Sequence, residues 1–413
     1  MISLWLRRHQ RSTFLVASGL STAGSFAGIT AKGWILIDGS DNPLLLALHF
    51  AALALPSLAV SGVAGVLTDR LGSERVLIRA QWALFGAGVL GAVAIPLTTG
   101  QQQMGLLLLS TLLIGIGSTF ELTARNKYCA LLVDEPGQLA PYLASFSVVF
   151  NVGKLVGPPL GGWLLALSGP TTALALDAAT YLLPIATIVW LLLPNRNAEQ
   201  TSSSVIQGPA RAANPASLRA AWDGCGPVLR HVLGFTALAC LVVFFHPGLA
   251  PLMARQVLDG SPQALGTFTS VLGAGSICGG LILQRNSRWL CSRPSLLLGV
   301  CTLVTGIAQV GLGLSRGVVT GLAMTFVMGA GTACLLAGSN LITQIGSPQR
   351  LRGRMAGLSQ IAFLGGGGVS GLLAALLTLA WGLGPTAALL GGIGLGLGIL
   401  EVVRRGKTRL LPA

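Results

Sequence analysis

Twelve apolar runs, each long enough to cross a lipid bilayer, constrain this chain more than any other feature of its sequence. A helix needs about 20 apolar residues to span the hydrocarbon core. Charged residues make up only 9% of the chain, whereas soluble domains carry roughly 25%. So few charges cannot cover a soluble surface, and the pattern predicts an all-α membrane protein with twelve transmembrane helices. The runs lie at 12–37, 44–67, 76–98, 104–124, 139–167, 171–193, 231–252, 263–284, 295–314, 317–345, 354–379 and 383–403.

The first run, from Ser12 to Ile37, follows three arginines. The apolar region of a signal peptide is roughly 7–15 residues long and ends near a small-residue cleavage site. This run is longer and lacks a persuasive cleavage site. It is therefore predicted to be the first spanning helix rather than a removable leader.

Basic residues are distributed unevenly between the two sides of the membrane. With the N-terminus placed inside, 22 of the 26 lysines and arginines fall in the two tails and the even-numbered loops. Only Arg255 and Arg316 fall on the opposite side, and Lys32 and Lys154 lie within apolar runs. Because lysine and arginine accumulate in cytoplasmic loops, both termini are predicted to be cytoplasmic. The same distribution explains the net charge of +14 without a nucleic-acid partner.

The longest polar segment, residues 194–230, divides the chain into two halves of six runs, 1–193 and 231–413. Its last part, residues 216–230, is expected to form an amphipathic helix at the inner membrane surface. Three pairs of positions recur between the halves at offsets of 214 or 215 residues, which indicates two pseudo-repeats: Gly65 with Gly280, Asn126 with Asn340, and Gly153 with Gly367.

The turn between the second and third runs carries the most specific motif. It reads Gly65-x-x-x-Asp69-Arg70-x-Gly72, and Arg75 follows before the next apolar run begins. This pattern resembles the loop between helices two and three of the major facilitator superfamily of transporters. The resemblance implies two parallel six-helix repeats with the substrate path between them.

The resemblance also implies a gating role for this loop. Asp69 is expected to cap the start of the eleventh span near Arg354, where exposed amides and the helix dipole favour a carboxylate. Glu121, near the inner end of the fourth span, is expected to pair with Arg70 or Arg75. The alternative is a solvated turn. The loop departs from the family pattern because Ser73-Glu74 replaces its usual basic pair. In the second half, Gln284 stands where the first half has the acid, so the latch is expected to be one-sided.

A glycine- and proline-rich motif lies in the fifth run. Gly153-x-x-x-Gly157 permits close helix approach, and Pro158 with Gly161 and Gly162 completes a Gly-Pro-x-x-Gly-Gly pattern. This pattern resembles the signature of antiporting exporters within the superfamily, and simple helix packing is the alternative. The links after the fourth and tenth runs resemble those of the subfamily that holds the enterobactin exporter and macrolide efflux pumps. That likeness covers about residues 10–400.

Three charged residues inside the apolar runs are the candidates for substrate contact or coupling: Lys154, Asp177 and Lys32. Burying such a charge near the membrane centre costs roughly 3 kcal/mol or more. Lys154 is expected to meet an anionic substrate group or a coupling carboxylate. Asp177 would either titrate or anchor a helix end. Lys32 would either face a cavity or extend its stem to water at the outer surface.

Together with these features, the resemblance implies a secondary transporter in the bacterial inner membrane. It would be a monomer that exports a small amphipathic organic molecule, siderophore-like or drug-like, by alternating access in exchange for protons. The fourth span lacks the arginine common in proton-coupled members of the superfamily. A metabolite facilitator or importer, a lysolipid flippase and a non-transporting scaffold are the alternatives. No catalytic triad, phosphate-binding loop or Cys-x-x-Cys pair occurs, so no enzyme activity, cofactor or metal site is expected.

Overall fold

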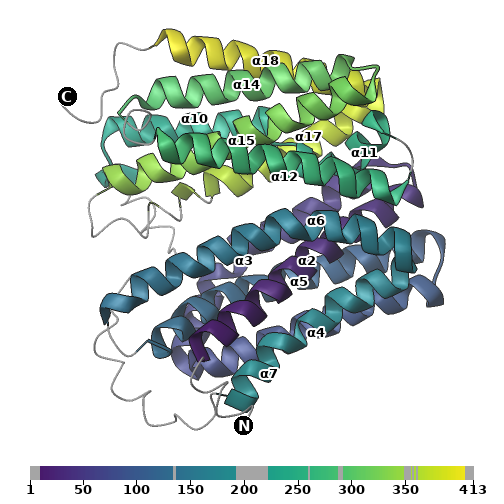
Figure 1. The fold of residues 1–413 in the computed structure, drawn as a ribbon, viewed down its shortest axis with the longest axis vertical. Helices are drawn as coiled ribbons and strands as arrows, with labels where there is room; N and C mark the ends of the chain where they lie inside the picture. The colour runs from purple at the N-terminus through teal and green to yellow at the C-terminus, as the bar shows by residue number, and fades with distance from the viewer. Residues whose placement is uncertain are drawn as a thin grey trace. The chain divides into compact units, whose positions relative to one another are not determined.

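The computed structural model describes residues 10–133, 136–191, 222–258, 261–286, 292–347, 355, 358–359 and 361–404, and every regular element in these ranges is a helix. The elements are α2 (Gln10–Asp38), α3 (Pro43–Leu71), α4 (Ser73–Leu97), α5 (Gly100–Leu131), α6 (Pro136–Thr180), α7 (Leu182–Leu191), α10 (Pro227–Val243), α11 (His246–Val257), α12 (Pro262–Arg285), α14 (Pro294–Leu314), α15 (Val318–Gly346), the π-helix η2 (Ile361–Gly365), α17 (Gly366–Trp381) and α18 (Leu383–Val403) (Figure 1).

The predicted apolar runs coincide with these helices. Ten helices of the described chain are long and apolar enough to cross a membrane, and the bent helix α3 makes eleven. The seventh run consists of two helices, α10 and α11, with only Phe244 and Phe245 between them. The eleventh run was predicted to begin at 354, and the part of it before residue 361 falls largely outside the described residues.

One of those spans, Val148–Val189, is counted as a single helix but covers the fifth and sixth predicted runs. Gly169 has a φ of 79° and interrupts the helical geometry of α6, a conformation that only glycine adopts readily. Before Gly169, α6 runs in the same direction as α2, because later residues of α6 contact later residues of α2. Gly153 lies against Thr22, Gly157 against Phe26 and Gly161 against Ala27. After Gly169, α6 runs antiparallel to α2, because later residues of α6 contact earlier residues of α2. Asp177 lies against Gly28 and Thr180 against Gly24. The chain therefore reverses at Gly169, which accounts for the twelfth span.

The helices form two compact units, residues 1–39 with 56–212 and residues 40–55 with 213–413. Helix α3 belongs to both because it bends by 41° between Pro43–Ser57 and Ala59–Leu71. Pro56 lies inside this helix, and a proline removes one backbone hydrogen bond and favours a bend. Most of the linker predicted at 194–230 lies outside the described residues, so the boundaries of the two halves stay a prediction.

In the second unit, α14 and α18 pack through facing rows of glycine and lie side by side in Figure 1. Both rows have a spacing of seven residues: Gly299, Gly306 and Gly313 on α14 face Gly398, Gly391 and Gly384 on α18. The glycine-rich last run is therefore a packing surface, as its place within an apolar run predicts.

The two halves repeat one packing relation. In the first unit, Gly153 and Gly157 of α6 lie against α2. In the second unit, Gly366 of α17 lies against Ala237 and Cys240 of α10. The fifth span thus packs on the first, and the eleventh packs on the seventh. This equivalence supports the two pseudo-repeats that the sequence offsets indicate.

Candidate functional site

Lys32 is buried inside the first unit, with only 1% of its surface exposed. Its Nζ donates a hydrogen bond of 2.8 Å to Oγ of Ser110 on α5. The serine hydroxyl in turn donates to the Ala87 carbonyl oxygen of α4, at 2.6 Å. Two helices therefore hold the ammonium group in the interior, and the alternative that Lys32 extends its stem to water is wrong.

Asp177 is also buried in this unit, with 2% of its surface exposed. The carboxylate fills the space beside Gly28, where a Cβ on that glycine would collide with it. Lys32 and Tyr181 are its electrostatic neighbours. Among the described residues, neither carboxylate oxygen makes a hydrogen bond of normal geometry, although the Tyr181 hydroxyl lies near enough to act on it. Since buried carboxylates are normally satisfied, two open acceptors at this position indicate a site for a proton, water or ligand.

A small polar cavity of about 40 Å³ lies close to Tyr181, between α2, α4 and α5. Its lining is almost entirely polar: Ser18, Ser21, Thr22, Ser25, Gln81, Ser118, Glu121, Arg125 and Tyr181, with Leu84 as the apolar member. Oε1 of Gln81 and the hydroxyl of Tyr181 are buried without hydrogen-bond partners. The cavity therefore retains unused hydrogen-bonding capacity inside an otherwise apolar bundle.

Glu121 and Arg125, which both line this cavity, form an ion pair of 2.9 Å. Both side chains are largely buried, with 13% and 8% exposed. The pairing of Glu121 with Arg70 or Arg75 was therefore wrongly predicted. Residues four apart on a helix face each other, so the next turn of α5 supplies the partner, while Arg70 and Arg75 lie exposed.

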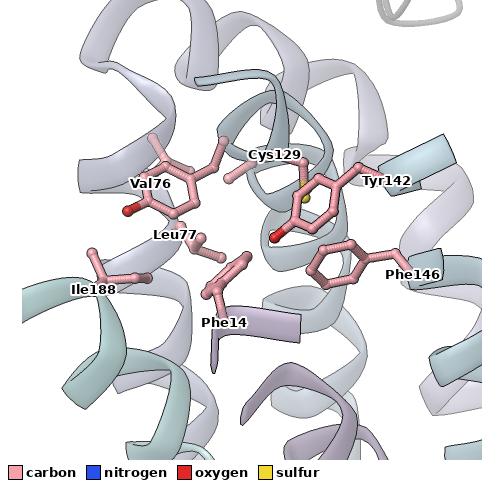
Figure 2. Close-up of a cluster of buried hydrophobic side chains, with 9 residues drawn as sticks. Phe14, Val76, Leu77, Cys129, Tyr142, Phe146 and Ile188 are labelled. Atoms are coloured by element: carbon pink, nitrogen blue, oxygen red, sulfur yellow. The ribbon is translucent and has the colours of Figure 1, made fainter. Parts of the chain in front are cut away.

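Figure 2 shows a cluster of buried hydrophobic and aromatic side chains, here called the aromatic cluster. The guanidinium of Arg125 stands 5.5 Å from the ring centre of Phe146, close enough for a cation–π interaction. Phe146 contacts Phe14 and Tyr142 at ring separations of 5.7 and 5.3 Å. Tyr142 donates to the carbonyl oxygen of Arg11. These contacts fill one end of the first unit with packed rings.

The loop between α3 and α4 places its acid on the surface. Asp69 forms an ion pair with Lys127 of α5, and 54% of its side chain is exposed. Gly72 adopts a φ of 86° and ends the turn, so this glycine is required for the loop geometry. Gly65 is buried. Arg354, near which Asp69 was expected to cap a helix, lies outside the described residues.

The motif of the fifth span is a packing surface for α2. A Cβ on Gly157 would lie 2.6 Å from both the Ala23 carbonyl oxygen and the Phe26 Cβ. Gly162 is buried, whereas Pro158 is partly exposed. Helix α6 continues through this proline with helical geometry. Lys154 is exposed beside the glycine face, and the structure does not bring it to Lys32 and Asp177.

Sequence reasoning missed the serines of α2. Ser18, Ser21, Ser25, Gly28 and Lys32 are spaced by three and four residues, which places them on one face of a helix. Ser18, Ser21 and Ser25 line the cavity, and Lys32 lies beyond them. The periodicity was visible in the sequence, but serine is common in transmembrane helices and carries no charge to draw attention.

The other unit also contains a buried charge. His231 of α10 and Glu401 of α18 are joined at 2.6 Å, with 30% and 1% of their side chains exposed. Figure 1 shows α10 and α18 within one group of helices. This hydrogen-bonded pair joins the beginning of α10 to the end of α18. It is therefore a structural contact at one end of the second unit.

Replacement His231→Leu is expected to lower the stability of the second unit. It removes the donor from a buried carboxylate, and an unsatisfied buried acceptor costs about 2 kcal/mol. Thermal unfolding of the purified protein in detergent measures the loss. His231→Gln restores an amide donor and is expected to unfold nearer to the wild-type temperature. Equal unfolding temperatures for wild type and His231→Leu would contradict the structural role.

Comparison with known proteins places these features in one family. A family model described as "Transmembrane secretion effector" matches residues 5–407. The multidrug efflux pump Tap of Mycolicibacterium fortuitum is 27% identical over 381 residues, covering 90% of each chain. Tap of Mycobacterium tuberculosis (strain ATCC 25618 / H37Rv) is 26% identical over 380 residues, covering 90% of this chain and 88% of that one.

Solved structures show the same fold at low identity. The nucleoside transporter NupG has a TM-score of 0.74 and 11% identity, covering 97% of this chain and all of its own. A bacterial homologue of the human lysosomal transporter Spinster has a TM-score of 0.70 and 15% identity, covering 98% of this chain and 99% of its own. The protein is thus a multi-pass membrane transporter with the major facilitator fold. The match over nearly the whole chain shows that it belongs to the transmembrane secretion effector family of major facilitator transporters.

Proposed function

We propose that this protein exports small amphipathic organic molecules, drug-like or siderophore-like, across the bacterial inner membrane in exchange for protons. Both termini would be cytoplasmic, and a monomer would work by alternating access without enzymatic chemistry or a cofactor. The observation that carries the proposal is the buried pair of opposite charges, Lys32 and Asp177, inside a membrane-spanning bundle.

Burying such charges inside a membrane is energetically unfavourable. Each costs roughly 3 kcal/mol or more at the centre of a bilayer, and a buried pair is often no more stabilising than apolar residues of similar volume. A scaffold that moves nothing gains little from retaining them. A transporter driven by protons needs an ionisable group that lies inside the membrane and changes its charge, so the pair favours coupled transport.

The direction of transport is proposed from two independent features. The motif Gly153-x-x-x-Gly157-Pro158-x-x-Gly161-Gly162 is similar to the exporter signature of the superfamily. Relatives that cover about nine tenths of this chain are named multidrug efflux pumps. Lys154 is the proposed contact for an anionic group of the substrate, because it is exposed beside this motif.

The function is tested with ethidium, a fluorescent amphipathic cation. Purified protein reconstituted in liposomes is expected to move ethidium across the membrane faster than protein-free liposomes do. A thermal-stability screen of amphipathic compounds then ranks substrates, because a ligand that binds only the folded state raises the unfolding temperature. Absence of both transport and stabilisation across a broad panel would instead favour the scaffold.

The loop between α3 and α4 is proposed to be the main inner gate, with Asp69 as its central residue. Asp69→Asn is expected to slow ethidium transport several-fold. Its effect on stability is expected to stay within about 1 kcal/mol, because the ion pair with Lys127 is exposed. Transport in proteoliposomes and thermal unfolding measure the two effects separately.

Two variants control this prediction. Lys127→Met breaks the same ion pair but keeps the acid, so it distinguishes the pair from the carboxylate itself. Glu74→Gln removes a nearby acid in the first turn of α4 and is expected to transport at the wild-type rate. Wild-type transport by Asp69→Asn would exclude the proposed gate and leave the fold unaffected.

A further inference from the structure

We propose that Asp177 is the proton-binding carboxylate of this transporter, and that the buried polar residues between Lys32 and Glu121 form a hydrated path through the first unit that serves it. We call this set the polar column. It consists of Lys32, Ser110, Asp177, Tyr181, the serines of α2, Gln81, Glu121 and Arg125. The inference rests on the proposed proton-coupled function and assigns that function to particular atoms.

The polar column follows one face of α2. Ser18, Ser21, Ser25, Gly28 and Lys32 succeed each other at intervals of three and four residues. The helix rises 1.5 Å per residue, so the fourteen steps from Ser18 to Lys32 extend over about 21 Å. The hydrocarbon core of a bilayer is about 30 Å thick. The stripe therefore extends through most of the membrane inside one helical bundle.

Asp177 lies part-way along this stripe with open acceptors. Gly28 gives it space, since any side chain at that position would occupy the place of the carboxylate. The ammonium of Lys32 donates its hydrogen bond to Ser110, and within the described chain neither oxygen of Asp177 makes a hydrogen bond of normal geometry, the Tyr181 hydroxyl being its neutral neighbour. A carboxylate held near a cation but not bonded to it can accept a proton without breaking an ion pair first.

The cavity provides the next step of the path. It connects Tyr181, beside Asp177, with Glu121 and Arg125. A volume of about 40 Å³ exceeds the roughly 10–15 Å³ that one water needs. Serine and tyrosine hydroxyls both donate and accept hydrogen bonds, so each of them can pass a proton between neighbouring waters. The open acceptors of Gln81 and Tyr181 provide further partners for such waters.

The charges around the column favour a proton over a metal cation. Lys32 on α2 already supplies a fixed positive charge, and Arg125 on α5 supplies another beside Glu121. Helix α4 contributes the uncharged Gln81, since its own ionisable residues lie in its first two turns. A sodium ion would need several oxygen ligands next to these cations. A proton needs one bond to an oxygen of Asp177. That bond forms as a hydronium ion reverts to water, and breaks as a water molecule accepts the proton on release.

The inner end of the column is closed by packed side chains. Glu121 is held by Arg125, and the guanidinium of Arg125 lies over Phe146 within the aromatic cluster of Figure 2. In this conformation these packed side chains separate Asp177 from that end of the unit. Release inward requires a rearrangement of these rings, which is what an exchanger needs to prevent a proton leak.

Infrared spectroscopy of the purified protein tests the site without any substrate. A C=O stretch of a protonated carboxylic acid is expected to appear as the pH is lowered, and to be missing in Asp177→Asn. Glu401→Gln is the matched control, since it removes a buried acid of the second unit, and the band is expected to persist. Asp177→Glu keeps a carboxyl group and is expected to shift the band. An unchanged band in Asp177→Asn and Asp177→Glu would overturn the assignment.

Ethidium transport in liposomes tests the consequence. Asp177→Asn is expected to retain exchange of radiolabelled for unlabelled ethidium, since that exchange needs no net proton movement. Uptake driven by a pH gradient is expected to fall roughly tenfold or more, in the range of typical coupling between two ligands. Undiminished pH-driven uptake, or uptake driven by a sodium gradient and lost in Asp177→Asn, would overturn the proposal. If wild type carries no ethidium, the proposed export of such compounds fails, while the infrared titration still decides the role of Asp177.

Discussion

Lys32→Met is expected to abolish pH-driven ethidium transport and to lower the unfolding temperature markedly. The change removes the cation nearest to a carboxylate that is 2% exposed and leaves that charge in a low-dielectric interior. Breaking a buried pair by removing one partner costs about 3–5 kcal/mol. A carboxyl group that keeps its proton recovers only part of this cost, because the neutral group still lacks a hydrogen-bond partner, and a group that does not release its proton cannot drive exchange.

A double variant separates the two consequences of this change. Lys32→Met combined with Asp177→Asn removes both charges, so it is expected to recover most of the lost stability while transport stays uncoupled from the pH gradient. Thermal unfolding and ethidium flux of the four proteins form a double-mutant cycle, in which contacting residues show non-additive effects. Strictly additive losses of stability would contradict the interaction between Lys32 and Asp177.

The second large effect concerns folding of the second unit. Gly391→Ala is expected to destabilise the protein strongly, because a Cβ there would lie 2.8 Å from the Gly306 carbonyl oxygen and 2.9 Å from the Val310 backbone nitrogen. Backbone atoms of a packed helix cannot rotate aside as a side chain can. Overpacking of this kind costs about 1–3 kcal/mol, and the yield of monodisperse protein is expected to fall.

The adjacent glycine provides a matched control. A Cβ on Gly392 would meet no atom within 4 Å, so Gly392→Ala changes the helix propensity but not the packing. It is expected to be neutral or to stabilise the helix by up to about 1 kcal/mol. Size-exclusion profiles and unfolding temperatures of the two variants provide the comparison. Similar behaviour of both variants would mean that α14 and α18 do not pack through these glycines.

The fold was largely predictable from the sequence because lipid imposes a strong length requirement. Each spanning helix must satisfy its own backbone hydrogen bonds across the apolar core, so long apolar runs and the charges between them define the helices. The reversal at Gly169 and the packing role of the glycines of α18 agree with this reasoning. The bend in α3 was not predicted, although Pro56 supplies its physical cause.

The site was less predictable because hydropathy does not define which way a helix faces. Lys32 and Asp177 were found as charges in apolar runs, but only the packing of α2 on α6 shows that they share one interior. Glu121 was assigned a partner by its depth in the membrane, whereas the partner came from the next turn of its own helix. Tyr181 and the serines of α2 are uncharged, so a search for charged residues inside apolar runs did not identify them.

The central claim is that protons drive export, and one measurement on wild-type protein tests it most directly. Ethidium uptake is followed in proteoliposomes with an acidic lumen, with the membrane potential clamped by potassium and valinomycin. A difference of one pH unit supplies about 1.4 kcal/mol, enough for roughly tenfold accumulation in a one-for-one exchange. The account predicts that ethidium accumulates and that nigericin, which collapses the pH gradient, abolishes the accumulation. Ethidium entry at the same rate and to the same level with and without the gradient would contradict it.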